Sequence, residues 1–133
     1  MAEPRKTILL VDDEEDLVLA LNARLKNIGY EVLVARDGLE ALRQGRSQNP
    51  DLIILDIMLP KMDGYKVCRL LKSDKRYSPI PILLLSARGQ DRDRDLGKKA
   101  GADDYLVKPF KSEDLVSRIK KLLKKSKTGV KHV

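Results

Sequence analysis

Charged side chains follow three short apolar runs of the sequence. Asp12 and Asp13 come directly after the first run, Asp56 after the second and Lys108 after the third. Such runs are typical of buried parallel strands, because a strand that is covered on both faces is apolar throughout. In an open parallel sheet, ligands bind beyond the carboxyl ends of the strands. We therefore expect the three carboxylates and the ammonium group to form one site.

The three carboxylates indicate a site for a hard divalent cation. Carboxylates that lie close together repel, and oxygen-only ligands suit Mg2+ or Mn2+, which would relieve the repulsion. A carboxylate beside such an ion can attack phosphorus and become an acyl phosphate. Lys108 would bring a positive charge to the phosphoryl oxygens, and Ser86, which follows another apolar run, would offer them a hydroxyl group.

Each of these residues also has a simpler structural interpretation. Asp12 and Asp13 could begin a helix, because acidic residues favour its first turn. Lys108 could be a surface lysine, and Ser86 a hydroxyl at a strand end. Asp56 is harder to explain in this way, since burying an unpaired carboxylate at the end of an apolar run is costly. The common position of all five residues at strand ends favours the functional interpretation.

The composition is that of one folded domain. The chain has 133 residues, of which 42% are hydrophobic, so it is long enough to bury a core. No apolar stretch approaches the roughly 18 residues that span a bilayer, and the N-terminus lacks the apolar core of a secretory signal. We therefore expect a soluble cytoplasmic protein. Cys68 is the only cysteine, which excludes an internal disulfide and leaves a packing role as the expected one.

The net charge of +7 belongs to the C-terminal part of the chain. Residues 1–107 contain 18 basic and 18 acidic residues, whereas residues 108–133 contain nine basic residues and two acidic ones. The body therefore lacks the basic groove of a nucleic-acid-binding protein, and direct DNA binding is not expected. We expect a domain over residues 1–125 and a flexible basic tail over 126–133. Residues 120–127 (KKLLKKSK) could contact an acidic partner, nucleic acid or a membrane surface, although a solvated helix face is the commoner meaning of such a charge run.

Strand and helix patterns alternate along the chain. Apolar runs bounded by turn residues predict strands over residues 7–11, 30–35, 51–56, 82–86 and 104–107. A helical pattern follows each strand, and Leu96 is the only strong apolar anchor of the helix expected over 92–100. Alternating elements with short connections favour right-handed crossovers and a parallel sheet covered on both faces. We therefore predict an α/β fold, a single doubly wound (βα)5 domain with a five-stranded parallel sheet.

These motifs resemble the receiver domain of two-component response regulators. The resemblance covers residues 6–125 and rests on six segments, which are 8–14 (ILLVDDE), 51–60 (DLIILDIMLP), 62–64 (MDG), 84–87 (LLSA), 101–105 (GADDY) and 108–110 (KPF). Together the segments are very specific for that family, whose fold is flavodoxin-like. The resemblance implies the strand order 2-1-3-4-5, with the site at the switch point between the first and third strands.

The resemblance also implies a role for each carboxylate. By position, Asp56 is similar to the phosphoacceptor, Asp13 to a direct Mg2+ ligand and Asp12 to a ligand that acts mostly through water. Met58 would lend its backbone carbonyl to the cation. Met58 and Arg88 would also flank the site, and their bulk or charge predicts that water attacks the acyl phosphate slowly, with a phosphoryl lifetime of minutes or longer.

Further positions are similar to family residues that hold the phosphoryl group or respond to it. Ser86 and Lys108 would contact the phosphoryl oxygens, and the peptide bond between Lys108 and Pro109 resembles the family's cis bond. Ala87 is small and would leave the phosphoryl group room to enter. Tyr105 resembles the aromatic switch that turns inward when Ser86 moves toward the phosphate. A tyrosine that is half-buried at a strand edge is the simpler alternative.

The function implied is that of a phosphoacceptor in a two-component signalling system. Asp56 would receive a phosphoryl group from a sensor histidine kinase or a histidine phosphotransfer protein. The chain itself would catalyse this transfer and also its own dephosphorylation. The surface of helix 92–100, strand 104–107 and the last helix would then switch, and so control a partner or a phosphorylation-dependent homodimer. No DNA-binding domain is expected so close to the end of the chain, which could act alone or be the receiver of a DNA-binding transcriptional regulator.

Two other classes of protein fit the pattern less well. A flavodoxin-like small-molecule binding module, such as a flavin carrier, would need a Ser/Thr/Gly phosphate loop after the first strand, where this chain is acidic. One Phe and no Trp are also poor material for stacking on a flavin. An aspartate-nucleophile phosphatase normally has another acid two residues after the nucleophile, where this chain has Met58.

Overall fold

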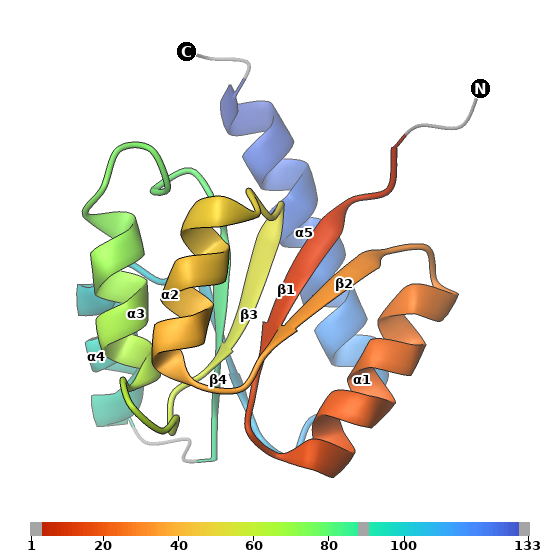
Figure 1. Cartoon of the computed structure of the whole chain (residues 1–133), viewed down its shortest axis with the longest axis horizontal. Coiled ribbons are helices and arrows are strands. Elements are labelled where there is room, and N and C mark those ends of the chain that lie inside the picture. Colours follow the sequence, from red (N-terminus) through yellow and green to blue (C-terminus); the bar gives the residue numbers. More distant parts are fainter. Residues whose placement is uncertain (1–3, 88–90, 131–133) are drawn as a thin grey trace.

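The computed structural model describes residues 4–87 and 91–130, which form five strands and five helices in strict alternation (Figure 1). The strands are β1 (Thr7–Val11), β2 (Glu31–Ala35), β3 (Leu52–Asp56), β4 (Ile82–Ser86) and β5 (Asp104–Val107). The helices are α1 (Glu15–Asn27), α2 (Gly38–Ser47), α3 (Gly64–Lys72), α4 (Asp91–Ala100) and α5 (Ser112–Val130). The strands lie where the apolar runs predict them.

The five strands form one parallel sheet in the order β2-β1-β3-β4-β5. Val11 pairs with Leu55 between β1 and β3, and Ser86 pairs with Val107 between β4 and β5. The residues at the carboxyl ends of these strands therefore lie close together, at the end of the sheet where the parallel strands terminate. The predicted doubly wound α/β fold, with the flavodoxin-like strand order, is confirmed.

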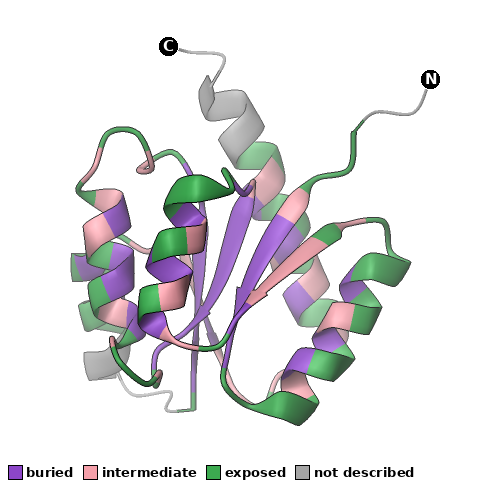
Figure 2. Cartoon of the chain, in the orientation of Figure 1, coloured by how far each residue is buried: buried purple, intermediate pink, exposed green. Residues whose placement is uncertain are grey.

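Helices cover both faces of the sheet (Figure 1). Helices α2, α3 and α4 lie on one face, and α1 and α5 lie on the other. Each face has its own core: the first lies under α2, α3 and α4, and the second under α1 and α5. Because successive strand residues point to opposite faces, Leu9 packs in the first core and Leu10 in the second. Every residue of β3 and β4 is buried (Figure 2), which explains why both strands are apolar up to their last residues, Asp56 and Ser86. Cys68 is fully buried in the first core, as its expected packing role requires.

Helix α4 packs on the sheet differently from what the sequence predicts. Leu96 was expected to anchor it, but this side chain is 39% exposed, and the prediction is wrong. Gly97 and Ala100 are buried instead. A Cβ on Gly97 would lie 3.2 Å from Leu84 Cδ1, so the helix contacts the sheet through its small residues. Close approach of the backbone replaces a large apolar anchor.

Helix α5 is longer than the sequence predicts. It continues to Val130 and so passes Lys125, the expected end of the domain. Residues 131–133 of the expected tail lie outside the described residues. Within residues 4–87 and 91–130, none of the helices combines the length and the apolar character that crossing a bilayer requires.

Candidate functional site

Asp12, Asp13 and Asp56 lie together at the carboxyl ends of β1 and β3. One carboxylate oxygen from each residue lies within 4.8 Å of the other two. Asp12 is 0% exposed and Asp56 is 5% exposed, whereas Asp13 faces solvent. Oxygen ligands at this spacing suit a hard divalent cation. The residues present therefore fit the Mg2+ or Mn2+ site that the sequence predicts.

Lys108 reaches this cluster from the loop after β5. Its Nζ lies 2.8 Å from Asp12 Oδ2 and 3.6 Å from Asp56 Oδ1. The peptide bond between Lys108 and Pro109 is cis, as the sequence resemblance implies. The backbone N–H of Lys108 donates to Ser86 O, 2.6 Å away, and so joins the loop to the end of β4. The ammonium group thus lies between two carboxylates, close enough to contact a phosphoryl group carried by either.

The end of β4 forms another side of the site. Ser86 is 5% exposed, whereas Ala87 is exposed. A hollow of about 520 Å³ opens beside them, and it is lined by Glu14, Leu17, Ala87, Lys108, Pro109 and Phe110. The small side chain of Ala87 therefore borders an open approach to Lys108. Arg88, the other residue expected to flank the site, lies outside the described residues.

Burial and crowded charge both act on the ionisation of Asp56. Burial and, after it, the neighbouring Asp12 raise the pKa of Asp56 from 3.8 to about 6, although Lys108 and the N–H of Met58 oppose the shift. Burial lowers the pKa of the Lys108 ammonium, but its hydrogen bond to Asp12 and the charges of Asp56 and Asp12 outweigh this and raise that pKa above 10.5. At neutral pH the cluster carries more negative charge than Lys108 neutralises. A divalent cation would relieve this excess.

The loop between β3 and α3 begins directly after Asp56 and carries Met58. Met58 is 71% exposed, and its backbone N–H favours the ionised form of the Asp56 carboxylate. The loop closes where the Gly64 N–H donates to Ile57 O, 2.8 Å away. A Cβ on Gly64 would overlap the backbone oxygen of Asp56, so the close approach requires glycine. Sequence reasoning missed this role, and the available signal was a glycine, which is a poor helix former, at the start of a helix.

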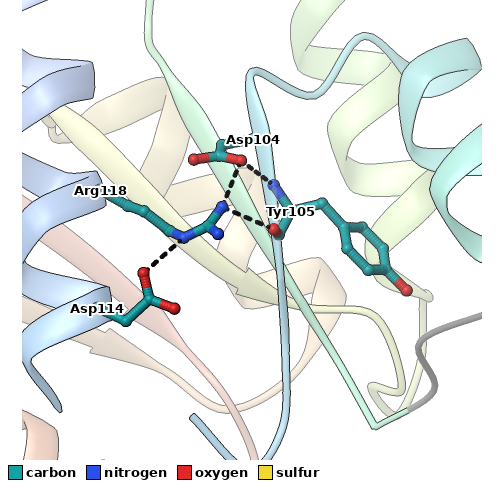
Figure 3. Close-up of polar contacts among 4 residues, drawn as sticks. All are labelled: Asp104, Tyr105, Asp114 and Arg118. Atoms are coloured by element: carbon teal, nitrogen blue, oxygen red, sulfur yellow. Dashed lines mark hydrogen bonds and ion pairs between the residues drawn. The ribbon is translucent and has the colours of Figure 1, made fainter. Parts of the chain in front are cut away.

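Tyr105, the expected switch residue, is anchored through its backbone (Figure 3). Arg118 Nη1 lies 2.8 Å from Asp104 Oδ1 and donates to Tyr105 O at 3.1 Å, while its Nε donates to Asp114 Oδ1 at 3.1 Å. The Tyr105 N–H donates to Asp104 Oδ1 at 2.8 Å. The tyrosine ring points away from this network (Figure 3), and the guanidinium carbon of Arg94 lies 5.8 Å from the ring centroid. The anchored backbone leaves side-chain rotation as the way in which this half-buried residue could change state.

Sequence reasoning missed Arg118. A charged residue on a helix usually faces solvent, so the sequence did not predict that Arg118 contacts β5. The one available signal was that Arg118 lies four residues after Asp114, a spacing that allows an ion pair on a helix. Beside this network lies a hollow of about 310 Å³ between α4, β5 and α5. The hollow is lined by Arg94, Gly97, Lys98, Ala102, Asp103, Asp104, Tyr105 and Arg118.

Comparisons with known proteins point to one family. The chain matches the family described as response regulator receiver domain over residues 8–120. It is 46% identical over 121 residues to the alkaline phosphatase synthesis transcriptional regulatory protein PhoP of Bacillus subtilis (strain 168), across 91% of this chain and 50% of PhoP. The chain spans about half the length of the curated relatives it matches.

Solved structures of receiver domains resemble this fold closely. The receiver domain of Francisella response regulator 1452 has a TM-score of 0.85 and 32% identity, over 92% of this chain and 99% of that one. The receiver domain of the sensor histidine kinase PA1611 from Pseudomonas aeruginosa PAO1 has a TM-score of 0.83 and 33% identity, over 90% of this chain and 98% of that one. The PA1611 structure holds a magnesium ion coordinated in its active site cleft.

Proposed function

Because this chain belongs to the family of response regulator receiver domains, we propose that Asp56 is its phosphoacceptor. The donor is the phosphohistidine of a sensor histidine kinase or of a histidine phosphotransfer protein. An oxygen of the Asp56 carboxylate forms a bond to phosphorus, the phosphorus–nitrogen bond of the donor breaks, and the donor histidine leaves with that electron pair. The observation that carries the proposal is the meeting of Asp12, Asp13 and Asp56 with Lys108 at one edge of the sheet.

Asp12, Asp13 and Asp56 would hold Mg2+, or Mn2+, together with the backbone carbonyl of Met58. When bound, the cation neutralises charge that develops on the phosphoryl oxygens. Lys108 supplies a further positive charge from its position between Asp12 and Asp56. In this proposal the chain itself catalyses both the transfer and the later hydrolysis, since it supplies the groups that stabilise the charge in both steps. Asp56 is the nucleophile of the transfer, whereas in the hydrolysis water attacks phosphorus and the Asp56 carboxylate leaves.

The phosphoryl group then changes the surface formed by α4, β5 and α5. Ser86 contacts a phosphoryl oxygen through its hydroxyl group, Ala87 leaves room for the phosphoryl group, and Tyr105 repacks on β5. This is a population shift between two states, biased by contacts that exist in only one of them. The altered surface controls the binding of a partner or of a second copy of the chain.

We propose that residues 1–125 form the domain that performs this function, and that residues 126–133, which begin within α5, form a basic extension of it. PhoP is named a transcriptional regulatory protein, and this chain matches half of its length. We propose that the chain is either a stand-alone regulator or the receiver part of such a transcriptional regulator, acting in the cytoplasm. A flavin-binding module is not favoured, because acidic residues occupy the position of its phosphate loop.

The test of the proposal is phosphorylation by a small donor. Wild-type protein is incubated with acetyl phosphate and Mg2+, and intact mass spectrometry measures the gain of one phosphoryl group. We expect wild type and Asp74→Asn to gain the group, because Asp74 pairs with Arg76 after α3 and takes no part in the site. Asp56→Asn should not gain it, and wild type in excess chelator should react far more slowly. Full phosphorylation of Asp56→Asn would exclude Asp56 as the acceptor.

A further inference from the structure

The first turn of α2 lies against the loop between β3 and α3 (Figure 1). The Gly38 N–H donates to Pro60 O at 3.1 Å. A Cβ placed on Gly38 would overlap the carbonyl oxygen of Met62 and lie 2.7 Å from Met62 Cβ, closer than real Cβ atoms approach. These loop atoms belong to the backbone or are attached to it directly, so they cannot give way as the end of a flexible side chain could. Any side chain at position 38 must therefore displace the loop.

The lack of room for a side chain, and not the backbone conformation, explains why position 38 is a glycine. Among the described residues, the glycines with positive φ are Gly29 and Gly101, whereas Gly38 begins a regular helix. Alanine is a better helix former than glycine. The side chain of Asp37 caps α2 by accepting the Glu40 N–H at 2.8 Å, and this cap does not need a glycine at position 38. The close approach to Met62 is the remaining physical reason for the glycine.

Lys61 gives a second sign that α2 determines the path of this loop. Its Nζ lies 3.5 Å from Asp37 Oδ2, so an ion pair adds to the contact made by Gly38. Lys61 has φ +69°, the left-handed conformation that is unfavourable for a residue with a Cβ. Such a conformation persists only where the surrounding contacts hold it.

The same loop begins at the proposed phosphoacceptor. Its N-terminal part adjoins the site, because Ile57, the residue after Asp56, donates its N–H to Leu85 O of β4 at 3.0 Å. The N–H of Met58 also favours the ionised form of the Asp56 carboxylate. We infer that Gly38 is a positioning residue: its contact with Met62 sets the path of residues 57–63, and so holds the Asp56 carboxylate and the Met58 carbonyl where one cation can take both. This inference rests on the proposed function, because it concerns the cation site of Asp56.

The test compares two alanine substitutions in the same helix. Gly38→Ala introduces the overlap with the loop. In Gly45→Ala the nearest atom to the new Cβ would be Leu71 Cδ1, 3.4 Å away, which is the end of a side chain that can adjust. The affinity for Mg2+ is measured by titration of the amide resonances of each folded full-length variant. We expect Gly38→Ala to bind Mg2+ about tenfold more weakly or worse, the usual loss when a residue that supports metal ligands is changed. Gly45→Ala should bind Mg2+ as wild type does.

A third variant separates positioning from loss of stability. Leu21→Ala removes a buried side chain of α1 on the opposite face of the sheet, and it should lower stability without touching the loop. We expect Leu21→Ala to keep the wild-type Mg2+ affinity. Wild-type affinity in folded Gly38→Ala, or an equal loss in Leu21→Ala, would overturn the inference. Failure of the wild type to bind Mg2+ would instead count against the proposed function.

If Gly38→Ala does not fold, a measurement on the wild type can still test the inference. Because the Gly38 N–H is bonded to Pro60 O of the loop, its amide resonance should shift during the Mg2+ titration with the same midpoint as that of Met58. The amide of Gly45, further along the same helix, should remain still. A Met58 shift without a Gly38 shift would show that the contact does not report on the cation, and the inference would fail.

Discussion

Replacing Asp56 by asparagine should make the cation-free protein more stable at neutral pH. In the wild type, burial and the carboxylate of Asp12 raise the pKa of Asp56 from 3.8 to about 6. At roughly 1.4 kcal/mol per pKa unit, ionising this carboxylate costs about 3 kcal/mol more in the folded protein than in the unfolded chain. Asparagine has a similar shape and no charge, so the substitution removes this cost. We expect the free energy of unfolding to rise by about 3 kcal/mol at neutral pH.

The pH dependence of this difference follows from the order of the two pKa values of Asp56. The folded-state pKa, about 6, lies above the unfolded value of 3.8, so the folded protein binds more protons than the unfolded chain between these values. The wild type therefore loses stability relative to Asp56→Asn as the pH rises through this window, and the difference is constant above it. Well below the window, the carboxyl group is protonated in both states and the two proteins should be equally stable.

Urea unfolding followed by circular dichroism measures the difference at a series of pH values in the presence of a chelator. Asp74→Asn serves as a control for removing an aspartate elsewhere, at a residue paired with Arg76. Added Mg2+ should stabilise the wild type more than Asp56→Asn, because a ligand stabilises the state that binds it. Equal stabilities of wild type and Asp56→Asn at neutral pH in chelator would refute the reasoning, since they would show that the ionised carboxylate carries no such cost.

Three further substitutions test other contacts. Lys108→Met should lower the free energy of unfolding in chelator at neutral pH by about 3 kcal/mol, because it leaves the fully buried Asp12 without the ammonium 2.8 Å away; urea unfolding that shows almost no loss would contradict this. Gly29→Ala and Gly101→Ala both strain a residue of positive φ, but a Cβ on Gly101 would lie 3.0 Å from Lys72 Cβ, whereas one on Gly29 would have nothing within 4 Å. Gly29→Ala should cost about 1 kcal/mol and Gly101→Ala about 2 kcal/mol, and equal losses of stability on thermal unfolding would rule out the packing argument.

The strands, the parallel sheet and the cluster of carboxylates could be predicted because they depend on local patterns, whereas the strand order was implied by the resemblance to receiver domains. A short apolar run specifies a buried strand, and the topology of a parallel sheet then brings the ends of such runs together. Asp12, Asp56 and Lys108 are far apart in sequence, yet each could be placed from its own run alone. Their common position follows from the fold, with no knowledge of individual side-chain contacts.

Residues whose roles depend on the approach of distant segments could not be found in this way. Gly38 and Gly64 matter because backbone from another part of the chain passes close to them, and Arg118 matters because it reaches across to β5. The same cause explains the error at Leu96. Hydrophobicity favoured its burial, whereas α4 packs closely through Gly97 and leaves the leucine partly exposed.

Strand β5 forms one edge of the sheet, and an edge strand can template the addition of a strand from another molecule. At Tyr105 both backbone groups are occupied by side chains, the N–H by Asp104 and the carbonyl by Arg118. A foreign strand would have to displace both before it could pair there. At Tyr105 this edge therefore resists the addition of a foreign strand, the kind of sheet growth that leads to aggregation.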